Sequence, residues 1–166
     1  VLDPGIFNRW GPDFAVEHGL VLACNEGAVM TVGFGHRYPS VEVWSTSRVD
    51  QPWRVDDEGI DAVSDLLHAA HVAVSDDVPA NEEWHYRPMG TGVAVPWGII
   101  LKLRISTLAG FEGGTKIYVN TISPAALAAM LLPKLFQARA AGRIAPMDLG
   151  DECEIPRGVL AATWVR

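Results

Sequence analysis

The stretch VAVPWGIILKLRISTLAGFEGGTKIYVNT, residues 93–121, carries the strongest structural signal in the chain. From residue 99 to residue 105 every second side chain is apolar, and Lys102 and Arg104 lie between them. After a glycine-rich break, residues 115–121 alternate again. A period of two places alternate side chains on opposite faces of a strand. The stretch therefore predicts an antiparallel hairpin in the middle of a sheet, with one dry face that supplies much of the core.

Three further strands are predicted upstream, over residues 20–24, 28–34 and 41–47, with turns that contain Gly27 and Pro39. They read as a meander, because hairpin-length turns join antiparallel neighbours. The third run alternates clearly, with one set of side chains on each face: Val41, Val43 and Ser45 against Glu42, Trp44 and Thr46.

Two helices are predicted. An acid at Asp56 or Asp57 caps the first, and an apolar stripe follows from residue 60 to residue 74. Ser123 and a proline at the first helical position begin the second, which runs to about residue 141. Pro133 lies inside it and predicts a kink or two abutting helices.

The remaining segments are less regular. Residues 1–13 read as a loop or one short turn, and residues 144–156 as an acidic loop. An edge strand over residues 84–89 and a last strand over residues 159–165 complete the sheet. The chain, residues 1–166, is thus predicted to be one α+β domain, with a mostly antiparallel sheet of about six strands and two helices packed on one face.

Composition excludes several kinds of partner. The hydrophobic fraction of 49% and the charged fraction of 20% are those of a globular protein. A net charge of −7 argues against nucleic acid and against an anionic membrane surface, since both attract clustered cations. No signal-peptide pattern opens the chain, and the longest apolar run ends at Pro133, so we expect a cytoplasmic protein.

Cofactor and metal motifs are weak. Asp65, His68 and His71 spread around their helix, and no metal site is predicted there. Residues 33–38, GFGHRY, begin like a dinucleotide fingerprint but lack its third glycine, so a hairpin turn with His36 on its tip is expected. Cys24 and Cys153 form no CxxC motif; buried thiols are expected, although a bridge stays open. No cofactor is predicted.

Residues 82–87, EEWHYR, gather ionisable and aromatic side chains. Three interpretations stay open. Glu83 and His85 could act as acid and base, whereas Trp84, Tyr86 and Arg87 are types that dominate binding interfaces. The aromatic rings could equally be sheet core with charges at the rim.

The glycine-rich loop, residues 108–114, offers a second candidate contact. It is expected to place Phe111 on an exposed tip, next to Glu112. A mobile connector whose phenylalanine folds back on the core is the alternative. Some of the six tryptophans could also mark a contact surface.

These observations favour a non-enzymatic, acidic protein-binding domain that neutralises or stabilises a partner protein, and its negative charge would suit a basic one. In type it resembles bacterial toxin-neutralising immunity proteins, antitoxin-like inhibitors that dock on their targets. The predicted contact residues are Glu82, Glu83, Trp84, Arg87, Phe111 and Glu112.

Two alternatives remain. One is a small hydrolase or transferase with a histidine and carboxylate centre, for which a pocket holding His85 and an acid would be the sign. The other is a subunit of a larger assembly, marked by a broad exposed apolar face. The sequence leaves the partner, the oligomeric state and the strand order undetermined.

Overall fold

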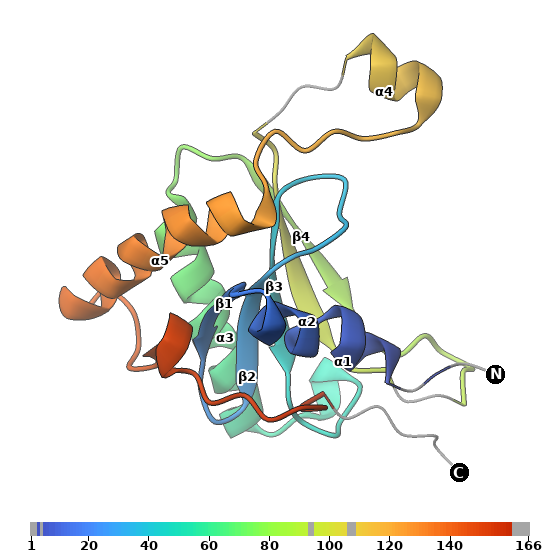
Figure 1. The fold of residues 1–166 in the computed structure, drawn as a ribbon. Coiled ribbons are helices and arrows are strands. Elements are labelled where there is room, and N and C mark those ends of the chain that lie inside the picture. Colours follow the sequence, from blue (N-terminus) through green and yellow to red (C-terminus); the bar gives the residue numbers. More distant parts are fainter. Residues whose placement is uncertain (1–2, 4, 93–94, 106–108, 161–166) are drawn as a thin grey trace.

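The computed structural model describes residue 3 and residues 5–92, 95–105 and 109–160. Six strands form one sheet in the order β4-β5-β3-β2-β1-β6, and every neighbouring pair is antiparallel (Figure 1). The predicted α+β class, with a mainly antiparallel sheet of about six strands, is confirmed. Of the two edges of this sheet, β4 forms one and the short β6 forms the other.

The predicted meander is confirmed as β1 (Val21–Cys24), β2 (Ala28–Val32) and β3 (Ser40–Ser45). The side chain of Asn25 stabilises the first turn, because its Oδ1 accepts from the backbone N–H groups of Gly27 and Ala28. All eleven residues of β2 and β3 are buried. Both faces of the sheet are covered at β2, so its sequence does not alternate between apolar and polar residues as a half-exposed strand does.

The predicted central hairpin is wrong in its second half. Its first run is β5 (Gly98–Leu103), an interior strand as expected. β3 and β4 (Ala80–His85) occupy both edges of β5, so residues 115–121 have no free edge of β5 to pair with. Instead, the short helix α4 (Gly110–Thr115) and an extended exposed segment project from the body (Figure 1). Edge-strand β4 begins and ends about four residues before the predicted 84–89.

Two long helices cover one face of the sheet, as predicted (Figure 1). In α3 (Asp57–Val74) the Asp56 carboxylate accepts from the N–H of Gly59, and in α5 (Pro124–Ala140) the Ser123 hydroxyl accepts from Ala126. α3 packs on β2 and β3, α5 packs on β1 and β2, and the two helices contact each other. Helix α5 runs as a single element through Pro133, so of the two expectations, a kink or two abutting helices, the second is not seen.

Short elements add to this plan. Helices α1 (Ile6–Trp10) and α2 (Pro12–Glu17) replace the loop predicted over residues 1–13, and 3-10 turns η1 (Pro52–Arg54) and η2 (Gly150–Glu152) follow later. Strand β6 (Asp148–Leu149) lies within the predicted acidic loop. The last predicted strand, 159–165, falls mostly outside the described residues. Among the described residues, no helix has the length and apolar character to cross a membrane.

Candidate functional site

Strand register gathers polar side chains on the sheet face that α3 and α5 do not cover, here called the open face. Val41, Val43, Ile99 and Leu101 belong to the core on the helix side. Alternation therefore sends their neighbours to the open face, and antiparallel pairing sets them side by side. The open-face residues of the three strands are Ser40, Glu42 and Trp44 on β3, Gly98, Ile100 and Lys102 on β5, and Asn81, Glu83 and His85 on β4.

A cavity of about 810 Å³ opens over this face, within the range of small-molecule sites. The N-terminal helix α1, the β2–β3 turn and the segment after β4 form its walls. Its lining residues are Asp3, Ile6, Phe7, Trp10, Gly11, Phe34, His36, Glu42, Trp44, His85, Tyr86, Pro88, Thr91, Val95, Pro96 and Ile100.

Aromatic rings form the apolar wall of the cavity. Trp10 stacks on Phe34 with ring centroids 6.2 Å apart and planes 8° apart. Phe7 packs against Trp44 at 6.4 Å, which joins α1 to the sheet. Trp10 is 57% exposed and Phe34 46% exposed, although both are large and apolar. Exposed aromatic rings at the mouth of a cavity suit the planar or apolar part of a ligand.

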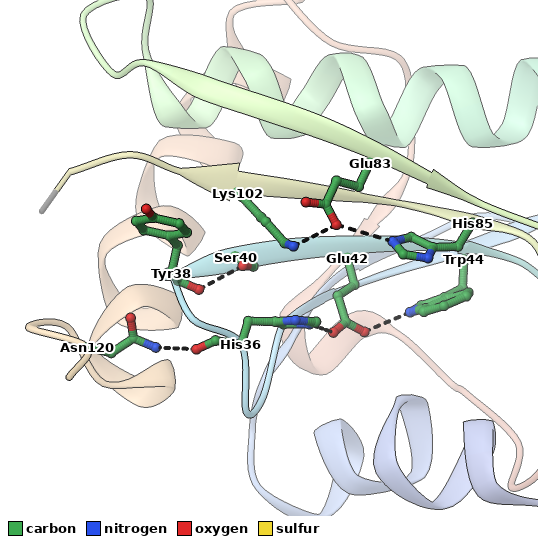
Figure 2. Close-up of polar contacts among 9 residues, drawn as sticks. All are labelled: His36, Tyr38, Ser40, Glu42, Trp44, Glu83, His85, Lys102 and Asn120. Atoms are coloured by element: carbon green, nitrogen blue, oxygen red, sulfur yellow. Dashed lines mark hydrogen bonds and ion pairs between the residues drawn. The ribbon is translucent and has the colours of Figure 1, made fainter. Parts of the chain in front are cut away.

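A histidine and a glutamate lie at the polar end of the cavity. The Nε2 of His36 is 2.5 Å from Oε1 of Glu42, and the indole N–H of Trp44 donates to Oε2 of the same carboxylate at 2.7 Å (Figure 2). Glu42 is buried and His36 is half-buried. Asn120 donates to the backbone carbonyl of His36 at 2.8 Å, so the segment after α4 also contacts this turn (Figure 2).

Two glycines make room for this arrangement. A Cβ atom at Gly33 would lie 2.7 Å from Cδ2 of His36 and 3.1 Å from the Glu42 carboxylate. A Cβ atom at Gly98 would lie 2.5 Å from the indole of Trp44. Contacts below 3.0 Å do not occur for real Cβ atoms. A side chain at Gly33 would therefore displace the His36 ring, and one at Gly98 would also meet the backbone oxygen of Val43 at 2.6 Å.

The chemistry available here is proton transfer or nucleophilic attack. A carboxylate that holds one ring nitrogen of an imidazole sets the ring's orientation and stabilises its charged form. The Trp44 N–H satisfies the second carboxylate oxygen, which lowers the cost of burying Glu42. His36 is therefore positioned as an acid–base or nucleophilic group that borders the cavity.

A second charged group lies further along the open face. Glu83 Oε2 is 2.6 Å from Nζ of Lys102 and 3.5 Å from Nε2 of His85 (Figure 2). The hydrogen bond from Lys102 lowers the pKa of the Glu83 carboxyl, and the charge of His85 acts in the same direction. Glu83 is thus anionic at neutral pH. The acid–base role predicted for Glu83 and His85 stays a prediction, with Lys102 as an additional partner.

The six predicted contact residues do not form one surface. On β4, Glu83 is on the open face, while Glu82 and Trp84 are on the opposite side, where Glu82 pairs with His71 of α3 at 2.8 Å. The Arg87 Nε lies 2.8 Å from the Asp50 carboxylate. Phe111 and Glu112 lie on α4, apart from β4 (Figure 1). Whether any of these residues touches a partner stays a prediction.

The segment from α4 to residue 119 carries exposed apolar side chains, which were the predicted sign of a subunit of a larger assembly. Phe111, Ile117 and Val119 are each more than half exposed. The Phe111 side chain is exposed and does not fold back on the core. This exposure does not support the interpretation of the loop as a connector. These side chains are the kind of exposed apolar group that a subunit interface requires, and that alternative stays a prediction.

The two cysteines lie together although 129 positions separate them in the sequence. Cys24 pairs in register with Asp148, whose carbonyl accepts from the Cys153 thiol at 3.3 Å. Burial raises the pKa of both thiols; their mutual hydrogen bond raises that of Cys153 further and partly offsets the rise at Cys24. Both are free thiols in this structure. Within the described ranges, no three metal-binding side chains of His, Cys, Asp or Glu come together.

The sequence interpretation missed the pair at the centre of the cavity. It placed His36 on an exposed turn tip, whereas in the structure His36 is half-buried and hydrogen-bonded to Glu42. One signal was present: the alternation over residues 41–47 places Glu42 and Trp44 on the same face. Nothing in the sequence indicated that the turn would fold back over that face.

Comparisons with known proteins identify the family of the chain and structures with a similar fold. A family profile described as "Domain of unknown function (DUF4921)" matches residues 1–162, and the chain belongs to that family. No curated protein sequence matches the chain. Its fold is similar to an ADP-glucose phosphorylase from Arabidopsis thaliana with bound ADP-glucose, with 19% identity and a TM-score of 0.61 over 73% of this chain and 45% of that one.

Two other solved structures have the same fold. A GalT-like protein from Arabidopsis thaliana has 20% identity and a TM-score of 0.59, over 73% of this chain and 46% of that chain. A uridylyltransferase mutant has 16% identity and a TM-score of 0.62, over 80% and 47% respectively. The chain therefore spans about half the length of these structural relatives.

The comparisons correct the functional interpretation. Immunity or antitoxin-like inhibition, the favoured prediction, is wrong because the fold is shared with enzymes that include an ADP-glucose phosphorylase and a uridylyltransferase. The transferase alternative with a histidine and carboxylate centre fits better. Its predicted centre, His85, does border the cavity, but the hydrogen-bonded pair inside is His36 with Glu42.

Proposed function

We propose that this chain is a nucleotide-binding domain of an enzyme that transfers nucleotidyl groups, with the aromatic cavity and His36 as its site. The observation that carries the proposal is the cavity of about 810 Å³, which joins stacked aromatic walls to a half-buried histidine paired with a buried glutamate. The structural relatives supply the reaction class, since they include a phosphorylase of ADP-glucose and a uridylyltransferase. A cytoplasmic location stays part of the proposal, on the sequence grounds given above.

The ligand class follows from the two ends of the cavity. A nucleobase is planar and apolar on its faces, and it suits the gap beside Trp10, Phe34 and Trp44. The phosphate-bearing end of the ligand would then lie toward the polar rim near His36. A sugar nucleotide has both parts in one molecule.

The reaction exchanges one phosphate ester bond for another. The P–O bond between the nucleotidyl phosphorus and its leaving phosphate breaks, and a new bond forms between that phosphorus and the acceptor. His36, held by Glu42, would assist as a nucleophile or as a proton carrier at the reacting oxygen. Positioning and charge stabilisation supply most of the catalysis in phosphoryl chemistry, so a fixed imidazole is more effective than a mobile one.

Binding and turnover test the proposal separately. ADP-glucose and UDP-glucose are titrated into the protein by calorimetry, and release of sugar phosphate from each is followed in a separate assay. We expect saturable binding of at least one of these ligands. His36→Asn should lower turnover by about 100-fold or more, the size typical of a lost acid–base group.

The matched control is His68→Asn, because His68 is exposed on α3 and outside the cavity. Glu42→Gln should also slow turnover, since the neutral amide can still accept from Trp44 but stabilises the imidazolium poorly. Failure of every nucleotide and sugar nucleotide to bind would reject the proposal. So would equal turnover in the His36 and His68 variants.

A further inference from the structure

Beyond the aromatic cavity, the open face holds a second, smaller hollow of about 410 Å³. Its lining residues are Arg37, Tyr38, Asn81, Glu83, Lys102 and Arg104. Three of the six side chains are cationic and one is anionic. This is a local excess of positive charge in a chain whose net charge is −7.

We propose that this hollow, called the cation hollow below, binds the phosphate groups of the nucleotide whose base occupies the aromatic cavity. The inference rests on the proposed function, because it assigns the second half of the same ligand. It also names the ligand's chemical class: a nucleoside diphosphate or a diphosphate-linked derivative.

Register makes the two hollows neighbours. Ile100 lines the aromatic cavity and Lys102 lines the cation hollow, and they are two residues apart on the same face of β5. Two residues of strand span about 7 Å. On the turn above, His36 lines the first hollow and Arg37 the second. A single extended ligand can therefore lie across both, passing the His36–Glu42 pair.

Among the described residues, Arg37 and Arg104 form no ion pairs, so their guanidinium donors are available to a ligand. The Arg37 Cζ atom lies 4.2 Å from the centroid of the Tyr118 ring and 5.3 Å from that of the Tyr38 ring. These cation–π contacts position the guanidinium group, and they leave its positive charge unpaired with an acid. Lys102 pairs with Glu83 at 2.6 Å. Arg104 is exposed, and it forms no ion pair with another residue in the described part of the chain.

Glu83 has a specific role in this arrangement. Its negative charge, set against those of Arg37, Lys102 and Arg104, leaves the lining residues with a net charge of plus two before a ligand binds. A phosphate that approaches Lys102 competes with Glu83, and Asn81 adds an uncharged donor at the rim. Planar guanidinium groups bind phosphate oxygens through two parallel N–H bonds, so Arg37 and Arg104 are the expected principal contacts.

Calorimetric titration of three probe sets tests the inference: inorganic pyrophosphate, the nucleosides adenosine and uridine, and the diphosphates ADP and UDP. In the wild-type chain we expect pyrophosphate and at least one diphosphate to bind, and to weaken as salt rises. Arg104→Gln and Lys102→Gln should each weaken both by about tenfold, the size expected for a lost charged hydrogen bond. Nucleoside affinity should stay unchanged.

Arg143→Gln is the matched control, since Arg143 is exposed after α5 and lines neither hollow. Equal pyrophosphate and diphosphate affinities in all four proteins, with nucleosides still bound, would overturn the inference and leave the proposed function standing. Pyrophosphate binding that depends on Lys102 and Arg104, without any nucleoside or nucleotide binding, would reject the proposed function and, with it, the assignment of this anion site to a nucleotide's phosphates. No pyrophosphate binding in the wild type would reject the inference.

Discussion

Single residues decide whether the aromatic cavity can form. The Trp44 indole lies against the backbone of β5 because Gly98 is its cross-strand partner. Any side chain at Gly98 would occupy the same space. At Gly33 an added Cβ would meet the His36 ring at 2.7 Å, so the observed position of that ring depends on this glycine. The sequence shows both glycines, but only the fold reveals that the Trp44 and His36 side chains pack against them.

Gly98→Ala should destabilise the chain and weaken ligand binding together. The new Cβ would lie 2.5 Å from the Trp44 ring and 2.6 Å from the carbonyl oxygen of Val43, and a backbone atom cannot move aside cheaply. We expect a loss of about 1–3 kcal/mol in the free energy of unfolding, measured in urea. Gly113→Ala, where no atom lies within 4 Å of the added Cβ, is the control. Equal stability of the two variants would contradict this account of Trp44.

At the scale of elements, the helices were predictable because their ends are local. Asp56 and Ser123 cap backbone groups three residues ahead, so the sequence alone predicts both starts. The predicted 99–121 hairpin was wrong because pairing is not local. The run at residues 115–121 has the pattern of a strand, but β3 and β4 already occupy the edges of β5.

Helix α5 and the β6–η2 segment are joined by a charged pair whose effect depends on pH. Arg139 and the N–H of Leu149 both donate to Glu152 and lower the pKa of its carboxyl to about 2. A depressed pKa stabilises the folded state above the unfolded value near 4.5, and this contribution is lost as the pH falls toward 2. The difference in melting temperature between wild type and Glu152→Gln should therefore be largest near pH 7 and shrink below about pH 4.

The control for this pair is Glu154→Gln, an exposed acid without an ion pair among the described residues. Its melting temperature should follow the wild type at every pH. A Glu152→Gln difference that stayed constant from pH 7 to pH 2 would show that the carboxylate charge is not the cause.

At the scale of the whole molecule, the first helix and the C-terminal segment are tied together. The side chain of Asn8 on α1 donates to the carbonyl of Leu160 at 2.7 Å and accepts from its N–H at 2.8 Å, although the residues are 152 positions apart. Arg157 adds an exposed pair with Glu17 of α2. Since α1 also forms a wall of the aromatic cavity, this tie supports the site.

Asn8→Ala should cost about 2–4 kcal/mol in the free energy of unfolding. The change removes two buried hydrogen bonds and leaves the backbone groups of Leu160 without a partner. Gln137→Ala, on the exposed side of α5, is the control and should change stability by less than about 0.5 kcal/mol. Urea unfolding measures both. A loss for Asn8→Ala no larger than the control's would contradict the tie.

By itself, the sequence determined the longer elements: alternation indicated β3 and β5, apolar runs between turns indicated β1 and β2, and caps with apolar stripes indicated α3 and α5. It also placed Glu42 and Trp44 on one face. Only the tertiary structure decided which strands flank β5, and that His36 meets Glu42 above them. The physical reason is range, because a period of two sets the face of each side chain, whereas the neighbours across that face depend on contacts distant in the chain.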